Sequence, residues 1–107
     1  MATHRRHRKI LTRAKGYSGQ RNSLYRKAKK AVEDAGIDAY RGRHLKKRTI
    51  RNLWVVRLNA AAKELGLSYS VLMNKLRNAK VILNRKMLAE LAVKNPLVFK
   101  KVVEKVK

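Results

Sequence analysis

The sequence predicts an all-α protein in which a long, basic, helical N-terminal extension precedes a small helical globular domain. Apolar residues recur at helical spacing from Ile50 to Leu65, and no stretch shows the two-residue alternation of a strand. The charge is also divided unequally. Residues 1–57 hold 18 Lys or Arg against 3 acids, and residues 58–107 hold 11 against 3, within a net charge of +23. We therefore predict two parts, the extension at 1–57 and the domain at 58–107.

The first forty residues predict weakly supported helices. Residues 4–15 read HRRHRKILTRAK, an apolar stripe too thin to pack alone, so a helix here is expected to form on a partner or to stay frayed. Gly16 to Gly19 predict a turn. From Gln20 onward, one helical face holds small or apolar side chains at Leu24, Ala28, Ala31, Val32 and Ala35. Gly36 and Gly42 either end helices or lie inside one long helix at about 1 kcal/mol each, and both alternatives stay open.

Residues 40–59 form a basic stretch that leads into the apolar stripe of the long helix. They read YRGRHLKKRTIRNLWVVRLN, with seven Lys or Arg side chains and no acid. At about 100° of rotation per residue, these cations fall all around the helix axis. A helix on a protein surface exposes one polar side to water. This distribution therefore predicts contact with a polyanion on several sides, and the continuous apolar stripe that follows disfavours the alternative of a disordered, solvated charge run.

Beyond residue 65, capping signals divide the chain into three short helices. Gly66 suits the C′ position of the long helix, Ser68 or Ser70 can cap the next one, and Asn84 can cap a helix over 85–93. Asn95-Pro96 predicts the last start, with a cap followed by proline at the first helical position. The positions expected to face inward are Val71, Leu72, Leu76 and Ala79, then Leu88, Leu91 and Ala92, and last Phe99, Val102, Val103 and Val106.

Several classes of function are disfavoured. The six acids form no catalytic pair and no Gly-rich phosphate loop is present, so we expect no enzyme and no cofactor. His4 and His7 lie one turn apart, but a basic RNA-facing tail explains them better than a metal site. Cysteine is absent, the longest apolar run is too short to span a membrane, and the first residues lack the apolar core of a secretory signal. We expect a soluble, intracellular protein.

The charge predicts nucleic acid as the partner, because neutralising phosphates releases counterions and gives strong, salt-sensitive binding. Four aromatic residues interleaved with arginine, Tyr17, Tyr25, Tyr40 and Trp54, suit stacking on bases. For Trp54, which lies in the apolar stripe, ordinary packing is the favoured alternative. Arg57 falls in the same stripe, where a paired or RNA-bound guanidinium and a snorkelling side chain are equally consistent.

A family resemblance rests on three segments, HRKILTRAKGYSGQRNSLYRKA, YRGRHLKKRTIRNLWVVRLNAAAKELGLSYS and LNRKMLAELAV. Most specific is the run R-x-L-W-x-x-R-x-N-A-A-A followed by G-L-S-Y-S. In these segments the chain resembles bacterial large-subunit ribosomal protein twenty, the L-20 family, and the resemblance extends over nearly all of its length. The resemblance implies a helical extension threaded through the 23S rRNA of the large (50S) subunit, and a small helical domain that also binds this rRNA.

The resemblance further implies a structural role in early subunit assembly, without catalysis, and in some bacteria repression of the protein's own operon through mRNA binding. The implied partners are 23S rRNA, neighbouring large-subunit proteins and its own mRNA, with one monomer in each ribosome and no membrane. The implied location is the cytoplasmic ribosome, with an organellar ribosome as the alternative.

Two departures from the family pattern stand out. Family members usually carry several more residues before the stretch that matches His7, so the tip of the rRNA-penetrating arm is expected to be short. Many relatives have Asp or Arg where this chain has Gly42, which keeps the continuity of the helix open. Residue by residue, the RNA contacts expected are Arg5, Arg6, His7, Arg8, Lys9, Arg13, Lys15, Tyr17, Arg21, Tyr25, Arg26, Lys29, Tyr40, Arg41, Arg43, Lys46, Lys47, Arg48, Arg51, Trp54, Arg57, Asn59, Lys75, Arg77, Arg85 and Lys86.

Two rival classes are weaker. A DNA-binding or nucleoid protein is consistent with three short helices after a basic arm, but no dimerisation seam is visible and cations on all sides do not suit a single groove. A membrane-active cationic peptide needs one clean amphipathic stripe, which the N-terminal half lacks.

Overall fold

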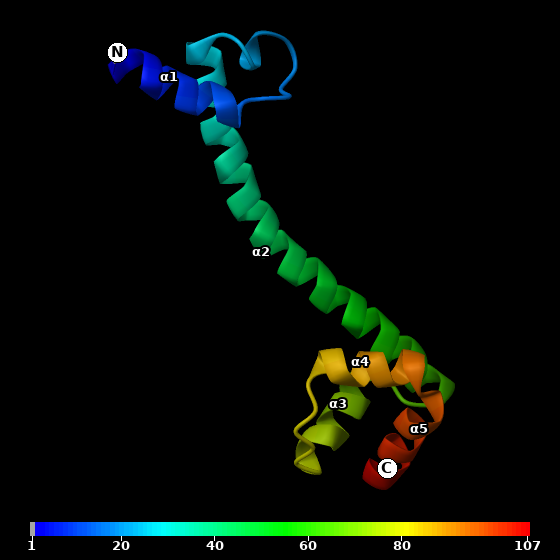
Figure 1. The fold of residues 1–107 in the computed structure, drawn as a ribbon. Helices are drawn as coiled ribbons and strands as arrows, with labels where there is room; N and C mark the ends of the chain where they lie inside the picture. The colour runs from blue at the N-terminus through cyan, green and yellow to red at the C-terminus, as the bar shows by residue number, and fades with distance from the viewer. Residues whose placement is uncertain (1) are drawn as a thin grey trace. The chain divides into compact units, whose positions relative to one another are not determined.

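The computed structural model describes residues 2–107 and is all-helical over that range (Figure 1). This confirms the predicted fold class. The elements in chain order are α1 (Ala2–Arg13), a 3-10 helix η1 (Gly19–Arg21), α2 (Tyr25–Glu64), α3 (Tyr69–Asn78), α4 (Arg85–Lys94) and α5 (Pro96–Val106).

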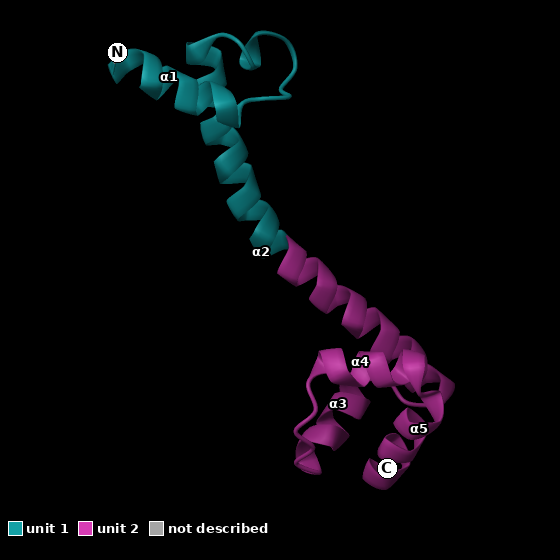
Figure 2. Cartoon of the chain, viewed as in Figure 1, with its two compact units in different colours: residues 1–45 teal, residues 46–107 magenta. Residues whose placement is uncertain are grey.

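The contacts within the chain group into two compact units, Met1–Leu45 and Lys46–Lys107 (Figure 2). We call them the first and the second unit. Helix α2 contributes its N-terminal part to the first unit and its C-terminal part to the second. The division into an extension at 1–57 and a domain at 58–107 was drawn from the charge distribution, and it stays a prediction.

The first unit has a minimal core. Helix α1 contains no buried residue, in keeping with its thin apolar stripe. Ala14, just after α1, and Ala28, in the first turn of α2, are fully buried. The rings of His7 and Tyr25 stack at 3.7 Å between centroids and 15° between planes. Two alanines and one ring stack are little apolar burial for a segment of this length, so the tertiary contribution to its helices is small.

A glycine-bounded turn joins α1 to α2, as predicted. Gly16 and Gly19 adopt positive φ angles of 90° and 62°, which glycine reaches without steric cost. The predicted helix from Gln20 was wrong at its start, because residues 19–21 form η1 and α2 begins at Tyr25. Asn22 and Ser23 lie between the two helices, and such side chains compete with helical hydrogen bonding.

Helix α2 continues through both internal glycines, which resolves the alternative that the sequence left open. Neither Gly36 nor Gly42 has a positive φ, and a Cβ atom built at either position meets nothing within 4 Å. The protein's own packing therefore requires glycine at neither position.

The core of the second unit joins the end of α2 to α3, α4 and α5. Its buried members are Leu58, Ala62, Leu72, Leu76, Leu88, Ala89, Phe99 and Val103. The predicted inward positions Leu72, Leu76, Leu88, Phe99 and Val103 are confirmed, while Leu91, Ala92, Val102 and Val106 are partly buried against this core.

Two predicted core positions were wrong. Val71 is 44% exposed, because it precedes Leu72 by one residue and so points about 100° away from it. Ala79 is exposed because it is the C-cap residue of α3 and lies past the last turn. Ala89 was missed, since a small residue beside Leu88 gives a weak periodic signal.

The predicted caps mostly occur. Gly66 ends α2 with a φ of 76°, and the N–H groups of Gly66 and Leu67 donate to the carbonyls of Lys63 and Ala62, a Schellman motif. Ser68 rather than Ser70 caps α3, accepting from the Val71 N–H at 3.4 Å, and Asn84 caps α4, accepting from the Met87 N–H at 2.9 Å.

The Asn95 cap was wrong in part. Pro96 is at the start of α5 as predicted, but the Asn95 side chain makes no capping hydrogen bond. Asn95 also ends α4, where its N–H donates to the Leu91 carbonyl at 2.9 Å. One residue therefore serves two helices, and its φ of −135° and ψ of 69° fit neither the usual cap geometry nor the helix.

Candidate nucleic-acid interface

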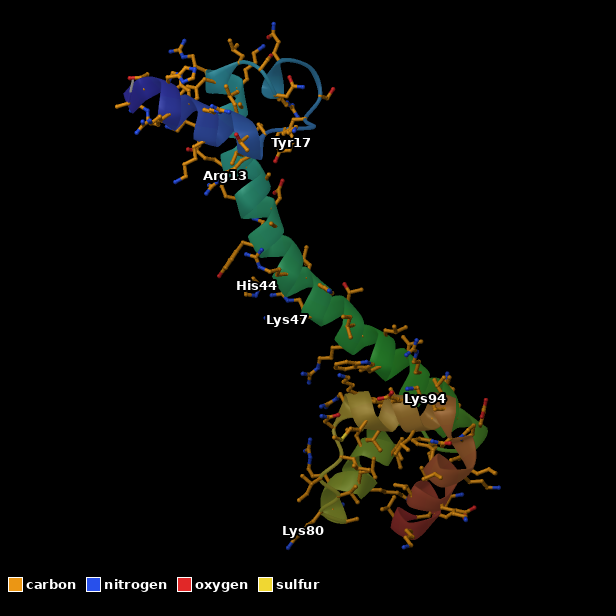
Figure 3. All side chains as sticks on the ribbon, in the orientation of Figure 1. Arg13, Tyr17, His44, Lys47, Lys80 and Lys94 are labelled. Carbon is orange, nitrogen blue, oxygen red and sulfur yellow. The ribbon has the colours of Figure 1, made fainter. Side chains whose placement is uncertain are left out.

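The centre of α2 carries its charge on every side. Each residue from 35 to 49 is exposed, so about four turns of the helix have no buried face. This stretch contains Arg41, Arg43, Lys46, Lys47 and Arg48, and His44 and Lys47 mark it in Figure 3. A helix without a packed face is exceptional in a globular protein. The exposure agrees with the predicted distribution of cations around the axis.

The basic charge is hardly compensated within the chain. Across residues 2–107, the ion pairs are Lys30–Asp34 and Lys94–Glu90, each one helical turn apart. The hydrogen bond and the charge of Asp34 raise the pKa of Lys30, and those of Lys94 lower the pKa of Glu90. Against 29 Lys and Arg residues, two surface pairs leave a strong positive field that an external polyanion can neutralise.

An open hollow of 860 Å³ lies in the first unit, between the turn after α1 and the first part of α2. We call it the Tyr17 hollow. Its lining residues are Tyr17, Ser18, Arg21, Arg26, Lys27, Lys30, Ala31, Asp34, Ala35 and Asp38. It brings together three predicted contacts, Tyr17, Arg21 and Arg26. Lys27 and Lys30 also line the hollow, although neither is among the predicted contacts.

The three predicted tyrosines have different surroundings. Tyr25 stacks on His7. Tyr40 meets the His44 ring edge-on at 4.6 Å, and the Arg43 guanidinium lies 5.9 Å from its centroid. Tyr17 is half-buried on the loop after α1 (Figure 3), and no other ring within residues 2–107 stacks on it. Part of Tyr17 therefore borders the open Tyr17 hollow, where an external partner can reach it.

A smaller hollow of 240 Å³ in the second unit lies beside Trp54. Trp54 packs against the core and also lines this hollow together with Arg57, Lys86, Glu90, Val93 and Lys94. Trp54 therefore packs against the core with one part of its side chain and borders the open hollow with another. Arg57 is exposed, as a snorkelling side chain is, and makes no ion pair within residues 2–107.

Two predicted contacts of the second unit are bound within the protein. The Arg85 Nε donates to the Tyr69 hydroxyl at 2.9 Å in a partly buried site, and the Lys75 ammonium donates to the main-chain oxygen of Lys107 at 3.3 Å. Asn59 is half-buried, while Arg77 and Lys86 are exposed. Among the predicted cations that lie beyond α2, Arg77 and Lys86 are therefore freer than Lys75 and Arg85.

The remaining predicted contacts, all from α1, the turn and α2, are exposed. They are Arg5, Arg6, Arg8, Lys9, Arg13, Lys15, Lys29 and Arg51. No three metal-ligating side chains come together in the described part of the chain, and none of its helices is long and apolar enough to cross a membrane.

Comparison with known proteins decides the family. The family model described as "Ribosomal protein L20" matches residues 1–102. The chain belongs to the ribosomal protein L20 family. Similar proteins named "Large ribosomal subunit protein bL20" include those of Francisella tularensis subsp. holarctica, at 58% identity, and Nitrosomonas europaea, at 53%. Both comparisons cover 95% of this chain and 86% of the relative.

Membership of the L20 family confirms the resemblance drawn from the sequence motifs. It also confirms the expectation of a structural ribosomal protein rather than an enzyme. The matched range contains every predicted contact residue, from Arg5 to Lys86.

Proposed function

We propose that this protein is a structural constituent of the large ribosomal subunit that binds 23S rRNA directly and promotes early assembly of the subunit. The observation that carries the proposal is the exposure of residues 35–49 on every face, with cations all around the axis. A single flat or grooved partner touches one side of such a helix. A folded RNA can surround it with several strands, so that one helix neutralises phosphates of separate segments and holds them together.

The two parts of the chain have different roles in this proposal. The extension at 1–57 threads between rRNA segments, and the domain at 58–107 presents a shaped surface to one helical region of the rRNA. Most of these contacts position the RNA backbone, since side chains cannot read the deep major groove of A-form RNA. The same surface binds the protein's own mRNA where that message folds to resemble the rRNA site. Other large-subunit proteins are its expected neighbours.

The test is a competition between a folded 23S rRNA fragment and duplex DNA of equal length for the full chain at physiological salt. We expect tighter binding to the rRNA fragment, because the cations are placed for several strands at once. Equal or tighter binding to DNA would overturn the proposal in favour of a nucleoid-type protein. Sedimentation with large subunits through a salt gradient provides the matching test on the assembled particle.

A further inference from the structure

The Tyr17 hollow combines three kinds of chemistry. Arg21, Arg26 and Lys27 supply cations, and Ala31 and Ala35 supply a smooth apolar wall. Tyr17 adds an aromatic ring on which no other ring of residues 2–107 stacks. Cations alone bind phosphate anywhere along a strand. An aromatic ring beside them adds a surface for a flat base, as in proteins that bind single-stranded nucleic acid.

The alanines leave space for that base. Ala31 and Ala35 are one turn apart on α2, and neither side chain extends beyond Cβ. The volume of 860 Å³ and the open mouth admit a nucleotide whose backbone continues on either side. A base within a duplex is stacked between its neighbours, so only an unpaired nucleotide can present its face to Tyr17.

Two carboxylates also line the hollow, and they are unexpected at a site for an anion. Asp34 accepts a hydrogen bond from Lys30 at 2.9 Å and is partly neutralised by it. Asp38, one turn further along, makes no ion pair within residues 2–107. A free carboxylate repels phosphate, but it accepts a hydrogen bond from the exocyclic amino group of a base.

We propose that the Tyr17 hollow binds one unpaired RNA nucleotide whose base carries an exocyclic amino group. The base lies against Tyr17, its amino group donates to Asp38, and its phosphate is held by the neighbouring cations. Uracil, which has a carbonyl where cytosine has an amino group, is disfavoured. This inference rests on the proposed function, because it specifies which part of an RNA the first unit takes.

Substitution of Asp38 tests the proposal, because the change in affinity should be a loss for one RNA probe and not for the other. The probes are short single-stranded oligocytidylate and oligouridylate, titrated against the full chain with anisotropy of a terminal dye as the readout. The wild-type chain should bind oligocytidylate more tightly. Asp38→Ala should weaken oligocytidylate binding about tenfold, the size of a hydrogen bond to a charged group. It should leave oligouridylate binding unchanged or slightly tighter.

Glu33→Ala is the matched control, because Glu33 is an exposed acid on the same helix that does not line the hollow. It removes the same charge and should tighten binding to both probes slightly. If Asp38→Ala behaves as Glu33→Ala does on both probes, Asp38 contacts no amino group and the proposal is overturned. Glu33 and Asp38 are both exposed on α2, and alanine has the highest helix propensity, so both variants should keep the fold.

Tyr17 gives a second, independent readout. Tyr17→Ala should weaken both probes about tenfold through lost stacking, while Tyr17→Phe should bind as the wild type does. Unchanged binding by Tyr17→Ala would also overturn the proposal. Failure of either test, with preference for the folded rRNA fragment over DNA retained, would remove this subsite alone. Loss of that preference in the wild-type chain would remove the proposed function itself.

Discussion

At the scale of single residues, Leu72 and Val71 differ most in what they contribute to stability. Leu72 is fully buried, while its neighbour Val71 is 44% exposed. We expect Leu72→Ala to lower the free energy of unfolding by about 2–5 kcal/mol, through lost burial and the cavity left behind. Denaturant melts of the full chain, followed at the second unit through Trp54 fluorescence, measure this. Val71→Ala is the control and should cost about 0.5 kcal/mol or less.

In a unit of about sixty residues, which buries only about 60% of its unfolded surface, a cost of that size approaches complete unfolding. A loss below about 0.5 kcal/mol for Leu72→Ala would contradict its place in the core.

Lys80 has a left-handed backbone conformation that the sequence did not predict. It has a φ of 54°, and its N–H donates to the Arg77 carbonyl at 3.0 Å while that of Val81 donates to the Leu76 carbonyl at 3.0 Å. This is a Schellman motif like that at Gly66, but with a side chain in the left-handed region. Lysine in this position has no sequence signal, because glycine is the residue that marks such an ending.

Lys80→Gly should therefore stabilise the second unit by about 0.5–1 kcal/mol, since the relieved steric cost of the left-handed conformation exceeds the added entropy of the unfolded glycine. A higher denaturant midpoint would show the effect. Ala79→Gly is the control: Ala79 has a φ of −76°, so glycine there should bring no gain. An equal rise for both variants would contradict the explanation.

At the scale of elements, the internal glycines of α2 weaken a helix whose own packing does not need them. Gly42→Ala should stabilise the helix by about 0.5–1 kcal/mol, because alanine loses less backbone entropy and its Cβ meets no atom within 4 Å. Thermal melts of the full chain by circular dichroism measure the gain. Gly66→Ala is the contrast, since a φ of 76° strains alanine and should lower stability.

Residues 1–45, isolated from the rest of the chain, should depend on RNA to form helix. Residues 1–45 bury only the two alanines completely and carry a large excess of cations, so little apolar burial opposes charge repulsion in the isolated segment. A 1–45 fragment should show weak helical circular dichroism at moderate salt and should gain helix when the rRNA fragment is added. Strong helicity without RNA would contradict this prediction.

Local signals predicted the elements well where a single residue type determines the geometry. Gly66, Ser68, Asn84 and Pro96 occupy the positions that their chemistry favours. The incomplete cap at Asn95 is a position at which two constraints meet. Asn95 ends one helix and begins the next, so its backbone satisfies neither pattern fully.

The candidate interface was predictable from the sequence only where it depends on spacing along one helix. Cations around the axis of α2 follow from helical spacing alone, and residues 35–49 are exposed as that spacing indicates. The Tyr17 hollow does not follow from spacing, because the turn after α1 must bring Tyr17 back to Ala31 and Asp38 across more than ten residues of chain. The hydrogen bond from Arg85 to Tyr69, sixteen residues away, is likewise a tertiary contact that spacing does not indicate, and an RNA contact of Arg85 stays a prediction.

At the scale of the whole molecule, the salt dependence of RNA affinity tests whether RNA contacts the central helix, by which we mean the middle of α2 around Arg48 and Arg51, or whether only water does. Arg48 and Arg51 are exposed and form no ion pair within residues 2–107. If each neutralises a phosphate, log K should fall with log salt by about 0.7–0.9 per contact. Replacing both with alanine should therefore flatten the slope for the rRNA fragment by about one to two units and weaken binding at physiological salt.

The double variant Lys100→Ala with Lys101→Ala is the matched control. Both lysines are exposed on α5 and outside the predicted contacts, and their loss removes the same net charge. If the long-range field of the protein alone drives binding, the two double variants should change slope and affinity alike, because each lowers the same total charge. If phosphates contact the central helix, only the arginine variant should flatten the slope, since counterions are released where phosphates are neutralised. If the slope of log K against log salt stays unchanged in the double variant Arg48→Ala with Arg51→Ala, these two arginines contact solvent and not phosphate.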